Sequence, residues 1–173
     1  DTAIRREKGD ELLGEADRIV KAEVAKALRR AEPDGLYKKL PGDWARTRPT
    51  LESIAQAVVN GLKASGGITI PLPTVVVKAA AWHDAQHLSR LDDIGAALFR
   101  SGTRQYTLPQ MALSLREIAG QGELALQVGV PMVTTPLQDF SGRKFYLTVL
   151  DARPESPAES VDEIREKLIA DVK

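Results

Sequence analysis

The sequence predicts an α+β fold that is mostly helical, with a small sheet drawn largely from the second half and an N-terminal amphipathic helical arm. Apolar residues between positions 10 and 31 recur at three- and four-residue spacing, which is the period of a helix that buries one face. Helix-capping signals recur further along the chain, and residues 144–151 alternate with the period of two that is typical of a strand.

The composition limits the classes of protein to which the chain can belong. The chain has 173 residues, with 24 Lys and Arg, 24 Asp and Glu, two His and no Cys. This length suits one domain, or one domain with an appendage. Because Cys is missing, disulfide frameworks, thiolate metal sites and cysteine nucleophiles are excluded. The formal net charge of zero argues against a protein that coats nucleic acid or anionic membranes by bulk electrostatics. It does not exclude binding through a local charged patch.

The sequence carries no targeting signal. No apolar run reaches the roughly 18–20 residues that span a bilayer, and the charged N-terminus lacks the apolar stretch of a secretory signal. We therefore expect no membrane association and a cytoplasmic location. The chain starts with Asp1 instead of Met, so we expect a processed, trimmed or partial chain.

The N-terminal region predicts one amphipathic helix over residues 10–31, which begins at Asp10. The first nine residues lack the helical period, and Gly9 and Gly14 each cost about 1 kcal/mol relative to Ala, so we expect this start to fray. We assign residues 1–32 to a helical arm that docks on a core or on a partner helix. The apolar stripe expected to bind a partner comprises Leu13, Val20, Val24 and Leu28.

Residues 33–49 predict an irregular connector between the arm and the body. The turn chemistry of Pro33, Asp34 and Gly35 ends the arm helix, and further Pro and Gly residues follow without any periodic pattern. Such a long irregular connector favours a functional loop or a hinge.

Residues 50–173 predict an α+β body. Thr50 is the expected N-cap of a helix that continues through Lys63. The two prolines of ITIPLP confine residues 68–73 to an edge strand or an extended passage. Residues 74–87 fit either a strand followed by a helix or a single helix.

The middle of the body predicts alternating short elements. Ser89 and Asp92 resemble a capping box, which predicts a helix that ends near Arg100. A short strand is expected over residues 106–108. A helix is expected over residues 109–119, because Pro109 suits a first helical turn.

The end of the body predicts two extended segments and a final helix. The extended segments are residues 124–130 and 144–151, and the Pro and Gly residues between them predict a long loop. Ser160 and Glu163 form a capping box, which predicts the C-terminal helix over residues 161–171.

His83 and His87 are candidate metal ligands. They are the two histidines of the chain, and on a helix their spacing of four places them on one face. Zinc proteases use two imidazoles in this way, with a Glu beside the first, where this chain has Asp84. A third ligand would come from Asp92 or Asp93. The simpler interpretation is two polar residues on the exposed side of a helix.

A basic segment, residues 26–48, is a candidate nucleic-acid interface. It holds seven cations and three carboxylates, so its charge is 7 − 3 = +4. Tyr37 and Trp44 lie between the cations, so the segment could contact phosphates and stack on a base. The alternative is a solvated linker whose two aromatic rings pack on the body. Under the nucleic-acid interpretation the binding residues are Lys26, Arg29, Arg30, Lys38, Lys39, Trp44, Arg46 and Arg48.

The expected function is a non-catalytic interaction or assembly protein, a structural or regulatory subunit that forms a homo-oligomer or joins a larger assembly. The sequence holds no phosphate-binding loop, dinucleotide fingerprint or nucleophile elbow, and we assign no catalytic residue and no cofactor. The first alternative is a DNA- or RNA-contacting regulatory protein that uses residues 26–48. The second is a metal-dependent hydrolase that uses His83 and His87.

Overall fold

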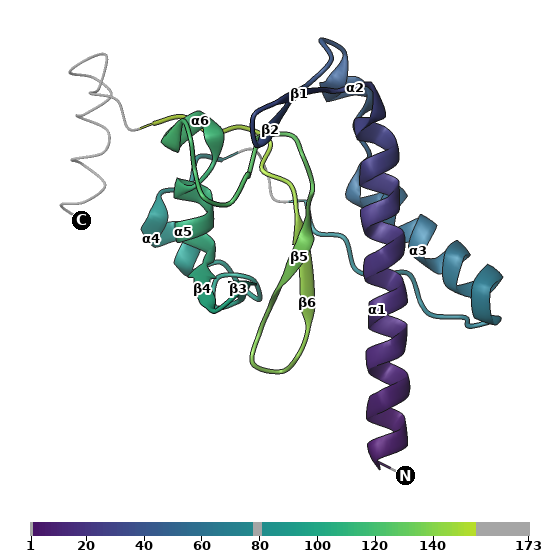
Figure 1. The fold of residues 1–173 in the computed structure, drawn as a ribbon. Coiled ribbons are helices and arrows are strands. Elements are labelled where there is room, and N and C mark those ends of the chain that lie inside the picture. The colour runs from purple at the N-terminus through teal and green to yellow at the C-terminus, as the bar shows by residue number, and fades with distance from the viewer. Residues whose placement is uncertain (1, 78–80, 155–173) are drawn as a thin grey trace.

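The computed structural model describes residues 2–77 and 81–154, and it has the α+β fold that the sequence predicts. The C-terminal helix expected over residues 161–171 lies outside these residues. Figure 1 shows a long N-terminal helix beside a second helix, and a sheet with shorter helices on its other side. The elements in chain order are α1 (Thr2–Ala27), the 3₁₀ helix η1 (Leu28–Arg30), β1 (Glu32–Asp34), β2 (Tyr37–Lys39), α2 (Trp44–Thr47), α3 (Leu51–Gly66), α4 (Ala85–Ser89), β3 (Leu98–Ser101), β4 (Arg104–Thr107), α5 (Leu108–Leu113), α6 (Arg116–Ala119), β5 (Met132–Gln138) and β6 (Lys144–Leu147).

Helices α1 and α3 pack against each other and form one of two apolar clusters in the described residues. Gly61 lies where the helices approach closely, because a Cβ atom there would come within 2.6 Å of Ile19 Cδ1. Thr50 caps α3 as the sequence predicts, with its side chain accepting a hydrogen bond from the Ser53 N–H. The fully covered members of this cluster are Val20, Val24, Ile54, Val58 and Leu62.

A polar clasp joins α1 to the sheet. The Asp17 carboxylate lies 2.9 Å from Lys144 Nζ, and it also accepts a hydrogen bond from the Tyr146 hydroxyl. The side chains of Asp17 and Lys144 are only about a fifth exposed, with values of 20% and 22%. An ion pair that is shielded from solvent is screened less by salt than a surface pair, so this clasp fixes where α1 lies on the sheet.

The larger sheet has the strand order β4-β3-β5-β6, and its neighbouring strands are antiparallel. Its inward face forms the second cluster together with α5. The buried members are Ala97, Phe99, Leu108, Met111, Leu115, Met132 and Leu137.

The expected helix over residues 109–119 is present in two pieces. Helix α5 begins one residue earlier than expected, because Thr107 and Gln110 form a capping box. It ends at Leu113 with Ser114 as its C-cap, and α6 starts after Leu115, whose extended backbone makes a bridge to Leu126. The tertiary contact at Leu115 therefore divides a segment whose local pattern predicts one helix.

The prediction of a helix from Ser89 to about Arg100 is wrong. Ser89 ends α4 instead of capping a new helix, and the chain then turns back on itself. Asp93 has φ of 66°, outside the helical region, and a Cβ atom at Gly95 would lie 2.6 Å from the Ser89 carbonyl oxygen. This tight reversal leads into β3.

The extended segment expected over residues 124–130 is also wrong, because it contributes a single bridge and no strand. The strand forms instead in the following residues, where we expected a long loop. Pro136 lies inside this strand, β5, and the pairing of β5 with β6 shifts register between Met132 and Leu137. A register irregularity is one of the few places where a sheet accepts proline.

Candidate functional site

The connector is an ordered segment that docks on the body. Its hairpin, β1–β2, places Tyr37 in a buried position, and the Tyr37 hydroxyl accepts a hydrogen bond of 2.7 Å from the Gly122 N–H. The Arg116 guanidinium lies over the Tyr37 ring at 5.2 Å and pairs with Asp34 at 2.6 Å. The expectation of an irregular connector is therefore wrong, because these long-range contacts give it structure.

Gln127 reinforces this docking with two hydrogen bonds to the backbone of Lys38. Its Oε1 accepts from the Lys38 N–H at 3.1 Å, and its Nε2 donates to the Lys38 carbonyl at 2.7 Å. Gln127 is itself buried. A side-chain amide thus takes the place of a neighbouring strand beside β2.

Trp44 anchors the far end of the connector. The ring is only 6% exposed, and Nε1 donates a hydrogen bond of 3.0 Å to the Gly129 carbonyl. Since Tyr37 and Trp44 are both buried, neither ring can stack on a base. The alternative that the sequence left open, with both rings packed on the body, describes their positions.

The cations of residues 26–48 are spread over the end of α1, η1, β2 and the region of α2. The Asp43 carboxylate lies 3.8 Å from Arg30 and 3.7 Å from Arg46, so it brings cations from η1 and α2 together. Lys39 lies 3.8 Å from Glu32. Of the expected nucleic-acid-binding cations, Lys38 and Arg48 are half-buried, whereas Lys26, Arg29, Arg30, Lys39 and Arg46 are exposed.

The apolar stripe of the arm is largely covered by the chain itself. Val20 and Val24 are each 2% exposed in the α1–α3 interface, and Leu28 packs against the same cluster. Leu13 is 39% exposed and is the one stripe residue with a substantial free surface. Val20 and Val24 are therefore not free for a partner in this structure, because α3 already covers them.

The two histidines do not form the helical pair that the metal interpretation needs. Helix α4 begins only at Ala85, with Asp84 as its N-cap, so His83 precedes the helix. His87 Nδ1 lies 2.9 Å from an Asp84 carboxylate oxygen, and the hydrogen bonds from the His87 backbone and ring lower the pKa of Asp84. Both imidazoles are exposed, and the described part of the chain brings no three potential metal ligands together.

The turn between β5 and β6 was not identified from the sequence. One oxygen of Asp139 accepts from the Ser141 N–H, the Ser141 hydroxyl and the Arg143 N–H, at 2.9, 2.7 and 2.9 Å. The other accepts from Arg143 Nε at 2.6 Å. Partial burial by itself would raise the pKa of Asp139, but the hydrogen bonds from Ser141 and Arg143 outweigh it and lower the pKa to about 2.

This braced turn presents Phe140 to solvent. Phe140 is 92% exposed, which is the largest exposed fraction among the big apolar side chains of the described residues. The signal that could have identified the turn is the run Asp-Phe-Ser-Gly-Arg at residues 139–143, since Asp, Ser and Gly are typical turn residues.

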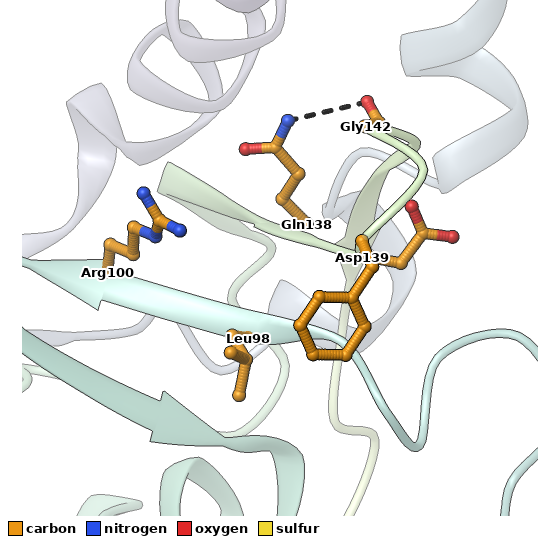
Figure 2. Close-up of a pocket in the computed structure, with 6 residues that line it drawn as sticks. Leu98, Arg100, Gln138, Asp139 and Gly142 are labelled. Atoms are coloured by element: carbon orange, nitrogen blue, oxygen red, sulfur yellow. Dashed lines mark hydrogen bonds between the residues drawn. The ribbon is translucent and has the colours of Figure 1, made fainter.

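A pocket of about 310 Å³ opens between β3 and this turn. Figure 2 shows Leu98 and Arg100 on the β3 side, and Gln138, Asp139 and Gly142 on the turn side. Phe140 lines the same pocket. Figure 2 also marks the weak contact of 3.5 Å from Gln138 Nε2 to the Gly142 carbonyl.

A second exposed apolar region lies between α3 and α4. In the part of this connection that the structure describes, no strand or helix forms. Ile70 packs on the α1–α3 cluster, whereas Leu72, Val76 and Val77 are 58%, 62% and 73% exposed. Trp82 is also exposed, with the Arg153 guanidinium 4.2 Å from its ring centre.

Comparisons of the chain with protein-family models, with curated proteins and with solved structures find no match. Among the described residues, no helix has the length and apolar character that a bilayer crossing requires. The strongest feature of the described residues is the exposed Phe140 beside a pocket.

Proposed function

We propose that this chain is a non-catalytic assembly protein that acts by self-association. The polar groups of the connector serve to dock it on the body. What supports the proposal is apolar surface that the chain leaves uncovered. Contiguous exposed apolar surface on a folded chain is typical of protein interaction sites.

The observation that carries the proposal is the exposure of Phe140 on a braced turn. A phenyl ring that is 92% exposed has its whole apolar surface in water, which is unfavourable unless a partner covers it. Asp139 holds the turn in one conformation, so a partner would immobilise little additional chain on binding. Aromatic residues, Phe among them, are enriched in protein interfaces relative to the rest of the protein surface.

Light scattering coupled to size-exclusion chromatography tests self-association. We expect the mean mass to rise above the 18.8 kDa of one chain as the concentration increases over about two decades around 10 μM. The mass should be kept in about 1 M salt, because apolar contacts are not screened. A mass of one chain at every concentration and salt would contradict the proposal.

A second candidate function is supported by the cation cluster around Asp43. Cations from η1 and α2 gather there on an exposed surface, which suits contact with a phosphate backbone without base stacking. Binding to duplex DNA or to RNA should then weaken steeply with salt. Replacing both Arg30 and Arg46 by Ala should remove about 2 phosphate contacts, which makes the plot of log affinity against log salt concentration less steep by about 1.8 for duplex DNA. The matched control is Arg18→Ala, in an exposed cation of α1 that pairs with Glu15. An unchanged slope in the double variant would remove this candidate.

A further inference from the structure

We propose that two copies of this chain pair about a twofold axis, with Phe140 of each copy seated in the pocket formed by Leu98, Arg100 and Gln138 of the other. This inference rests on the proposed self-association and names the surface that carries it. Four features of the β3 and β5–β6 region support it.

The first feature is that the pocket and the projecting ring are adjacent. Phe140 lines the same pocket that a second Phe140 would enter. When two such surfaces face each other, each ring reaches the pocket of the other copy, which is the reciprocal pattern of an isologous contact. A ring and a pocket on opposite sides of the molecule would instead give rings or open filaments. The geometry therefore favours a closed dimer.

The second feature is the fit between ring and pocket. The pocket volume is about 310 Å³, and a cavity of roughly 150 Å³ is large enough to hold a benzene ring. One phenylalanine side chain therefore fits beside the residues already present. The opening between β3 and β5 exists because their pairing is limited to Leu98 with Gln138, and continued pairing would place Pro136, which has no N–H, opposite Arg100.

The third feature is the charge of the surface. Arg143 pairs with Asp93 at 2.8 Å and with Asp139 at 2.6 Å. Arg100 has no ion pair among the described residues and is exposed at the pocket edge. Two cations and two carboxylates make this surface formally neutral. A surface without net charge gives no electrostatic attraction to a strongly acidic or basic partner, whereas a second copy of this chain, which is itself formally neutral, meets it without net repulsion.

The fourth feature is the position of the exposed Arg100 side chain at the pocket edge. Its guanidinium can lie over the face of an incoming ring, as Arg143 already does at 5.5 Å over Phe145. This contact would orient the incoming Phe140 and leave the guanidinium partly in water. Because the contact carries no net charge and buries a phenyl ring, the association should persist at high salt.

The test is the dimer dissociation constant measured by sedimentation equilibrium for three variants. Phe140→Ser removes the ring and should weaken dimerisation at least tenfold. Gln138→Trp fills the pocket while it keeps the ring, and should weaken dimerisation similarly. Leu36→Ser is the matched control, because Leu36 is also exposed on a hairpin turn, at 70%, and lies away from this pocket. Circular dichroism checks that each variant folds.

The outcomes separate this inference from the proposed function. Weakening by Phe140→Ser and Gln138→Trp, with Leu36→Ser unchanged, supports the reciprocal contact. A wild-type dimer that neither pocket variant weakens overturns the contact and leaves self-association in place. A wild-type chain that stays monomeric overturns both. If Phe140→Ser weakens dimerisation and Gln138→Trp does not, the ring takes part in dimerisation but binds outside this pocket, and the proposed contact is overturned.

Discussion

Gln127 and Lys38 are 89 positions apart in the chain, yet the side-chain amide of Gln127 satisfies both the N–H and the carbonyl of Lys38. This contact, with those of Tyr37 and Trp44, converts the connector into part of the body. The backbone of the connector is consequently held against the body.

Replacement of Gln127 by Ala should destabilise the fold by about 1–3 kcal/mol, because two backbone groups of the half-buried Lys38 lose their partners. Urea unfolding followed by circular dichroism measures the change. The control is Gln56→Ala, in an exposed glutamine of α3 that bonds to Asn60 at 3.1 Å, for which we expect a change within about 0.5 kcal/mol. Equal effects of the two substitutions would show that the Gln127 bridge adds nothing.

Gly129→Ala should destabilise more than Gly35→Ala. Both glycines have positive φ, 75° and 60°, so both substitutions strain the backbone, by about 1 kcal/mol or more. Only at Gly129 would the new methyl group meet a neighbour, at 3.3 Å from Trp44 Nε1, whereas Gly35 faces open space. Thermal unfolding of both variants compares them, and a Gly35→Ala variant that is the less stable would contradict the Trp44 anchor.

Tyr146→Phe should change how stability depends on alkaline pH. Burial, followed by the hydrogen bond to Asp17, raises the pKa of Tyr146 above its usual value. A raised folded-state pKa means that the stabilisation is complete below about pH 10, the unfolded-state pKa, and is lost as the pH rises from there. Wild-type stability should therefore fall faster above about pH 10 than that of the variant, by at most about 1.4 kcal/mol per pH unit. If the stabilities of the wild type and the variant depended on pH in the same way, the hydrogen bond between Tyr146 and Asp17 would be contradicted.

Asp139→Asn should act in the opposite pH range. The pKa of Asp139 is lowered to about 2. The contribution of this carboxylate to the stability of the fold is therefore complete above its unfolded-state pKa of about 4, and it is lost as the pH falls toward the folded-state pKa. The stability difference between wild type and the variant should thus shrink between about pH 5 and pH 2. Asp10→Asn, in an exposed carboxylate of α1, serves as the control. A difference that stays constant down to pH 2 would contradict the bracing role of Asp139.

Local signals in the sequence predicted the elements whose structure depends on nearby residues. The cap at Thr50 and the periodicity after it predicted α3, and the alternation around Phe145 predicted β6, although β6 is shorter than expected. The α+β class follows from such signals. Segments controlled by distant contacts were not predictable in this way: Ser89 and Asp92 have the spacing of a capping box, but the chain reverses there to reach β3.

The candidate site shows the same division. Aromatic residues within a basic segment suggested stacking on nucleic acid. In the structure both rings are buried, and each is held by a hydrogen bond to a glycine about 85 positions away, Gly122 for Tyr37 and Gly129 for Trp44. Phe140 was overlooked because an isolated aromatic residue in a turn has no periodic pattern. Its exposure and its pocket depend on β3, which lies about 40 positions earlier in the sequence.

The most direct test of the account is the concentration dependence of the backbone amide NMR spectrum of the wild-type chain. Self-association through the proposed surface predicts shifts that grow with concentration and cluster at Leu98, Arg100 and residues 138–142. Residues 35–37 at the other hairpin turn should remain unchanged. A spectrum that does not vary with concentration, or shifts confined to the exposed residues 72–77, would contradict it.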